Sequence, residues 1–239
     1  MDLDRITHPL RLARGSHQPG SGKGCAMNVI SYINGDTEIT DFPATSARPL
    51  AAFVQLCNDL LAGPDGYLSS QDSVLAIDLG WQTMGTADVV DSVIHAWVAE
   101  LLTSPTWGVV QYAENTSIAA IFDIADLHRT LASGEMPPIA AWDSADRAAR
   151  AIRATSAGAG VYAFRAAYQS TALVDAEGCE TLDAVTGNAL RAHTLATEGT
   201  GAARIVEVTC HAIRAWRRLA RLDDPGQIDP ASVDSARDK

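Results

Sequence analysis

Apolar residues recur at intervals of three and four positions along much of this 239-residue chain, in segments that glycine and proline separate. Residues 86–102 show the pattern most clearly, because Val93, Trp97 and Leu101 follow one another at four-residue steps. This spacing lines apolar side chains along one face of an α-helix. Strand-like alternation is scarce, and the apolar run at residues 109–112 is too short to anchor a sheet. The sequence therefore predicts a mostly α fold, in which several helices pack as an orthogonal or bundle-like domain.

Alanine dominates the hydrophobic fraction, which is 47% of the chain and large enough for a sizeable core. Its small side chain lets helix axes approach closely. Residues 142–169 are helical by alanine's propensity alone, although Gly158 and Gly160 weaken or split this stretch. The predicted helices lie at residues 25–34, 50–61, 70–79, 86–102, 117–131, 142–169, 182–197 and 202–222.

Pro137 and Pro138 mark the best candidate for a domain boundary, because proline does not suit a helix interior. We predict an N-terminal helical domain at residues 1–136 and an alanine-rich helical part at residues 139–222. Residues 223–239 are rich in Asp, Ser and Pro, and we predict that this tail is disordered.

The net charge of −11 restricts the classes of partner. It argues against general nucleic-acid binding, which needs a basic surface to neutralise phosphates. No apolar run approaches the roughly 20 residues of a membrane-spanning helix, and the N-terminus lacks the apolar segment of a secretory signal. The four cysteines are scattered, which suits a reducing compartment. We therefore predict a cytoplasmic protein without cofactors or membrane contact, which binds a protein partner or a second copy of itself.

Residues 15–28, with the sequence GSHQPGSGKGCAMN, raise the question of a phosphate-binding loop. Lys23 follows Gly22, but His17 stands where the first glycine of a Walker A loop belongs. Gly24 stands where a serine or threonine would bind magnesium, so the stretch fails this motif. Glycine-rich amides at the start of a helix can still hold an anion, with Lys23 beside them.

Cys25 offers a second chemistry, because a helix that begins here places the thiol at its N-terminus. The macrodipole and the free amides there stabilise a thiolate. His17 would then be the base of a nucleophilic cysteine, and Asp41 or Asp59 would orient that base. The alternative is that Cys25 is a small buried hydrophobe that packs its helix into the core.

The same region contains several residues of the types that bind metals. A zinc site needs three or four of them in a defined geometry. Their spacing matches no known motif, so we favour a solvated acidic loop and predict no metal. The set comprises His17, Cys25, Asp36, Glu38 and Asp41.

The last predicted helix carries a basic face in an acidic protein. This face would dock an acidic partner or another subunit. The alternative is that its cations complement the negative end of the helix dipole, with Asp223 and Asp224 partly neutralising them. The residues of this face are Arg214, Arg217, Arg218 and Arg221.

About the first 140 residues resemble a family of actinobacterial and actinophage proteins with a GSH…GxCxM hallmark. The resemblance implies that His17, Cys25, Asp41, Asn58 and Asp59 form a constellation, without assigning it an activity. The matching segments are Gly15-Ser16-His17, Gly24-Cys25-Ala26-Met27, Tyr32-Ile33-Asn34-Gly35, Asp41-Phe42-Pro43 and Asn58-Asp59, followed by Gly85-Thr86 and Pro105-Thr106-Trp107.

The chain departs from the family at Asn28, where the family carries Glu, and at Thr45, where it carries a second Cys. Either change would remove a ligand or a proton carrier from a chemical site. The same segment would otherwise hold the first two helices together through polar hydrogen bonds, in which Asn28 and Asn58 take part.

Two functions follow from these observations. The first is a non-enzymatic, partner-binding or regulatory helical protein of phage or mobile-element type. It rests on the helical body and the lack of a complete catalytic motif. The alternative is a Cys/His-dependent hydrolase or transferase that uses Cys25 as nucleophile and His17 as base.

Overall fold

A computed structural model describes residues 11–15, 17, 22–114, 117–174, 178–197 and 201–223. The predicted mostly α fold is confirmed, since the described residues form nine α-helices and only two short strands. The predicted disordered tail lies outside the described residues from position 224 onward. The helices are α1 (Ala26–Asn34), α2 (Arg48–Leu61), α3 (Ser70–Gln82), α4 (Asp91–Thr103), α5 (Ile118–Ala132), α6 (Ile139–Arg153), α7 (Gly158–Ser170), α8 (Gly178–Ala196) and α9 (Gly201–Ala220).

Two minor kinds of element complete the described fold. The strands β1 (Arg11–Leu12) and β2 (Lys23–Gly24) pair in parallel beside the start of α1. Two 3₁₀ turns, η2 (Val109–Tyr112) and η3 (Thr171–Val174), follow α4 and α7. None of the described helices is both long enough and apolar enough to cross a membrane.

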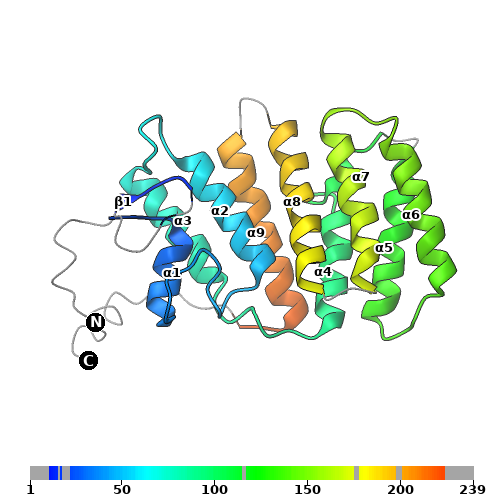
Figure 1. Cartoon of the computed structure of the whole chain (residues 1–239), viewed down its shortest axis with the longest axis horizontal. Coiled ribbons are helices and arrows are strands. Elements are labelled where there is room, and N and C mark those ends of the chain that lie inside the picture. The colour runs from blue at the N-terminus through cyan, green and yellow to red at the C-terminus, as the bar shows by residue number, and fades with distance from the viewer. Residues whose placement is uncertain are drawn as a thin grey trace.

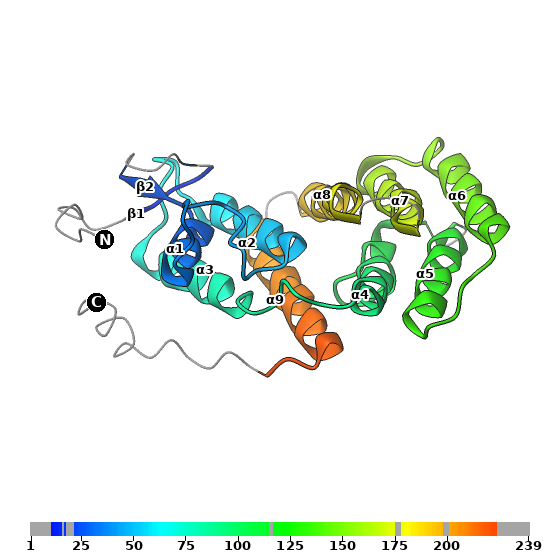
Figure 2. The same ribbon diagram turned by 60° about the horizontal axis from the view of Figure 1, so that its bottom comes forward.

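The helices stand side by side in an elongated array, with α1 and α3 at one end and α6 at the other (Figure 1). The last helix, α9, lies in the interior of this array rather than at its edge, between α2 and α4 (Figure 2). Helices α4 to α8 form the part of the array that ends in α6. Within this part, α7 packs against α8 and α4 packs against α5.

An aromatic cluster joins α2, α4 and α9 at the centre of the core. Trp97 packs edge-on against Phe53 and Trp216, with ring centroids 6.2 Å and 5.3 Å away. Its indole Nε1 donates to the Ala212 carbonyl at 3.0 Å, so this buried polar atom is satisfied. The hydrophobic core is continuous across Pro137 and Pro138. The domain boundary at these prolines stays a prediction.

The alanine-rich stretch forms two helices, α6 and α7, and the second begins at Gly158. Gly158 has a φ of 54°, a left-handed conformation that favours glycine. Ala149, Ala163 and Ala189 are fully buried, which agrees with the close helix packing that the composition predicts.

One predicted helix begins later than its periodicity indicates. The pattern starts near Thr86, but α4 begins at Asp91. The Thr86 hydroxyl accepts a hydrogen bond from the Ala47 amide at 2.9 Å, and its carbonyl accepts one from the Trp216 indole at 3.1 Å. These tertiary contacts hold the segment before Asp91 out of the helix.

Candidate binding cleft and the Cys25 network

Cys25 is the N-cap residue of α1, and its backbone amide donates to the Asn28 side chain at 3.0 Å. The side chain is almost completely buried. Its thiol faces the Asp41 carboxylate, with Sγ and Oδ1 3.5 Å apart. Burial, together with the nearby Asp41 charge, raises the pKa of the Cys25 thiol to about 12. This direction is opposite to the lowered pKa of an activated thiol.

The structure brings most of the hallmark side chains into one hydrogen-bonded network. The Asn28 amide donates to Asp41 at 2.8 Å. Asn58 is fully buried, accepts from the Ala26 amide at 3.1 Å and donates to the Ala13 carbonyl at 2.8 Å. We call Cys25, Asn28, Asp41 and Asn58 the Cys25 network. It joins α1, α2, the loop before α2 and Ala13, the residue after β1.

The remaining predicted members bind the N-terminal strand region instead of the thiol. Asp59 accepts a hydrogen bond from the Gly15 amide at 2.8 Å. The ring of His17 donates to the Ala13 carbonyl at 3.2 Å. Among the described residues no hydrogen bond joins His17 to Cys25. Lys23 lies over the Tyr67 ring, 5.2 Å from its centroid.

The network therefore agrees with the interpretation that the hallmark segment holds the first two helices together. Among the five residues that the sequence offered as possible metal ligands, Cys25 and Asp41 contact each other. Across the described residues, no three His, Cys, Asp or Glu side chains gather closely enough to hold a metal ion.

The basic face of α9 divides between two sides of the helix. Arg214 and Arg218 are exposed and line a shallow hollow, where Arg218 pairs with Glu100 at 2.5 Å. Arg221 is exposed just beyond the helix. Arg217 corrects the prediction of a four-arginine face, because its side chain is buried. It donates to the carbonyls of Gln82 and Met84 at the end of α3, and to that of Asp223.

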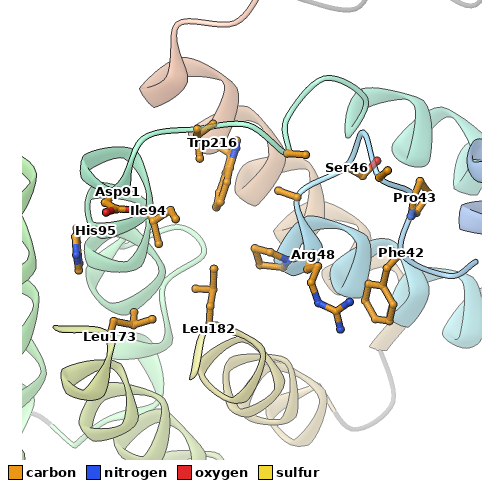
Figure 3. A pocket seen from close by; sticks show the side chains of 15 residues that line it. Phe42, Pro43, Ser46, Arg48, Asp91, Ile94, His95, Leu173, Leu182 and Trp216 are labelled. Atoms are coloured by element: carbon orange, nitrogen blue, oxygen red, sulfur yellow. The ribbon is translucent and has the colours of Figure 1, made fainter. Parts of the chain in front are cut away.

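A cleft of about 580 Å³ lies between the segment that leads into α2 on one side and α4, α8 and α9 on the other (Figure 3). We call it the Trp216 cleft, because the Trp216 indole on α9 is part of its lining. Its lining is mainly apolar. It comprises Phe42, Pro43, Ala44, Ser46, Ala47, Arg48, Pro49, Ala87, Val89, Asp91, Ile94, His95, Leu173, Leu182 and Trp216.

Buried hydrogen bonds fix the walls of this cleft. The Ser46 and Thr83 hydroxyls lie 2.8 Å apart, and the Thr86 amide donates to the Thr45 carbonyl at 3.0 Å. The Trp216 indole is held by its bond to the Thr86 carbonyl. These bonds hold the segment before α2, the segment before α4 and the Trp216 indole in place along one side of the cleft.

An ion pair links α2 to α8 beside the cleft. The Arg48 guanidinium donates to Asp183 at 2.9 Å and lies over the Phe42 ring, 4.1 Å from its centroid. Both charged side chains remain partly exposed. The residues are 135 positions apart, so no local sequence pattern predicts the pair.

A chain of polar side chains runs from the cleft into the core. The Nδ1 atoms of His95 and His128 lie 2.9 Å apart, and the His128 Nε2 lies 2.9 Å from the Ser170 hydroxyl. His128 is fully buried, and this burial lowers its pKa to about 3. Neither histidine belongs to a site that the sequence predicts, because only the packing of α4 on α5 brings them together.

Comparisons with protein-family models, with curated proteins and with solved structures found no match for this chain.

Proposed function

We propose that this protein is a cytoplasmic, non-enzymatic factor that binds an apolar segment of a partner protein in the Trp216 cleft. The observation that carries the proposal is a mainly apolar cleft, one side of which is held by buried hydrogen bonds. The partner belongs to the phage or mobile-element setting that the family resemblance suggests.

The rim of the cleft favours a protein partner over a small molecule. Val90, next to two lining residues, is 67% exposed, and Arg48 and Asp91 are also exposed. Small-molecule sites usually enclose most of their ligand. An apolar base with an exposed polar and apolar rim instead resembles the anatomy of a protein interface.

The residues that carry the family resemblance support the cleft. Asp41 is anchored in the Cys25 network, and the next two residues, Phe42 and Pro43, line the cleft. Thr86 holds both Ala47 and the Trp216 indole. The hallmark positions thus act as the frame of a binding site.

The enzymatic alternative receives less support from the same residues. A nucleophilic cysteine needs an accessible thiolate beside a base. Cys25 is buried and has a raised pKa, and its hydrogen-bond partner is the acidic Asp41. Cys25, Cys57 and Cys210 are all free thiols, which supports a reducing compartment such as the cytoplasm.

Selection of peptides from a display library on the folded full chain tests the proposal. Enriched peptides are titrated against the wild type and against Leu173→Glu, which places a charge in the cleft lining. We expect the substitution to weaken binding by about tenfold or more, because a buried carboxylate replaces an apolar contact.

The matched control is Leu195→Glu, an exposed leucine on α8 that does not line the cleft. Circular dichroism verifies that both variants keep the helical content of the wild type. Enriched peptides that bind both variants alike, or the absence of any enrichment, would contradict the proposal.

A further inference from the structure

Two polar side chains interrupt the apolar lining of the Trp216 cleft on α4. Asp91 and His95 lie one helical turn apart and both line the cleft (Figure 3). Asp91 is exposed and lies close enough to His95 to interact with it electrostatically. Arg48 and Phe42 lie on the opposite side of the cleft (Figure 3).

The hydrogen-bond chain behind His95 determines which of its ring nitrogens carries a proton. The Ser170 hydroxyl donates to the Ala167 carbonyl at 2.7 Å, so towards His128 it acts as an acceptor. The His128 ring must then donate from Nε2, and a neutral His128 has its lone pair at Nδ1. His95 therefore donates its Nδ1 proton to His128.

This assignment gives the cleft a defined polarity. With Nδ1 protonated, a neutral His95 has its lone pair at Nε2, the ring nitrogen that the contact with α5 leaves available. Asp91 is also an acceptor when ionised. The polar end of the cleft thus presents two acceptors on one helix.

The charges around the cleft also favour a cation. Arg48 lines the cleft and is paired with Asp183 beside it, so the positive charge of Arg48 is largely cancelled. The N-terminus of α4 contributes a partial positive charge of about one half, which the full charge of Asp91 exceeds. The exposed Asp88 lies just before this helix and adds to the negative potential.

We infer that the partner segment carries a lysine or arginine side chain beside its apolar residues, and that Asp91 and His95 accept hydrogen bonds from this cation. The inference rests on the proposed function and specifies the chemistry of the partner. A guanidinium suits the arrangement, because its several N–H groups can reach two acceptors at once.

Two blocked dipeptides test the inference on the full chain. Acetyl-Trp-Arg-amide supplies an aromatic ring and a cation, whereas acetyl-Trp-citrulline-amide has nearly the same shape without the charge. Binding is measured by NMR titration of backbone amides and of the His95 ring nitrogens. We expect the arginine probe to bind about tenfold more tightly than the citrulline probe.

Two isosteric variants locate the preference. Asp91→Asn should abolish the difference between the probes. Asp143→Asn makes the same change in net charge at an exposed residue of α6 that does not line the cleft, and it should keep the difference. Binding of the arginine probe should also shift the Nε2 resonance of His95.

The outcomes separate this inference from the proposed function. Equal binding of the two probes, both weakened by Leu173→Glu, would overturn the cation preference and leave the apolar cleft in place. Failure of both probes to shift any resonance of the cleft at millimolar concentration would overturn the proposed function and the inference together.

Discussion

The imidazole rings of His95 and His128 stack with their centroids 5.2 Å apart and share one hydrogen bond between their Nδ1 atoms. Such a bond needs one protonated and one unprotonated nitrogen. A second proton on His128 would place two donors face to face in a buried environment. The pair therefore requires a neutral His128, which gives the fold a pH-dependent stability.

Mild acid should destabilise the protein through its buried histidines. Burial lowers the pKa of His128 to about 3 and that of His193 to about 4, from an ordinary value of 6.5. Between pH 6.5 and the lowered pKa, each histidine binds a proton in the unfolded chain but not in the folded protein. The free energy of unfolding is therefore highest above pH 6.5 and falls as the pH decreases below that value. At pH 5 each histidine should lower the free energy of unfolding by about 2 kcal/mol.

Urea unfolding at pH 7 and pH 5 measures this loss. His193→Gln should remove about half of the pH-dependent part, because one of these two buried histidines is then absent. Equal stability of the wild type at the two pH values would contradict the assignment of neutral buried histidines.

Cys25 should resist alkylation in the folded protein. The thiol is 2% exposed and its pKa is raised to about 12, so almost no accessible thiolate exists at neutral pH. We expect iodoacetamide to label the half-buried Cys210 before Cys25, which should react only after unfolding. Peptide mapping by mass spectrometry measures both rates. Rapid labelling of Cys25 at pH 7 would instead support the enzymatic alternative.

Asn58→Ala should destabilise the fold by about 2 kcal/mol, because the buried Ala26 amide loses its partner. The Ala13 carbonyl loses one of its two donors and keeps the His17 ring. Asn34→Ala is the matched control, since Asn34 is exposed at the end of α1 and should change stability by less than about 0.5 kcal/mol. Similar unfolding free energies for the two variants would show that the Cys25 network does not hold the helices together.

Arg217→Ala and Arg214→Ala compare two arginines on different sides of α9. Arg217 is buried and donates to carbonyls at the end of α3, so its removal should cost about 2 kcal/mol. Arg214 is exposed, and its removal should stay within about 0.5 kcal/mol. Chemical denaturation of both variants measures the difference. An Arg217→Ala protein with the free energy of unfolding of the wild type would show that these hydrogen bonds do not contribute to stability.

Helical periodicity predicted the elements of this fold, since α2 and α5 follow their apolar stripes closely. It did not predict where α4 begins, because Thr86 is held by partners from α2 and α9. It also could not distinguish Arg217 from Arg218. Adjacent residues on a helix point in different directions, and the buried direction depends on which helices pack against α9.

The candidate site also has features that the sequence predicted and features that depend on contacts between distant helices. The sequence singled out Cys25, Asp41 and Asn58, which the structure brings together. It placed neither the cleft nor the pair of His95 and His128 there, because these depend on contacts between distant helices. Such contacts follow from packing angles, which a single sequence does not specify.

The interior position of α9 has a consequence for biosynthesis. Residues 201–220 are synthesised after the helices that they pack between, yet they supply Trp216 and the Ala212 carbonyl to the centre of the molecule. At about 5–20 residues per second, the earlier helices emerge many seconds before their central partner. During that interval the apolar faces of α2 and α4 stay uncovered and need protection from aggregation. A chain that stops before position 201 lacks the residues of α9 that complete this core.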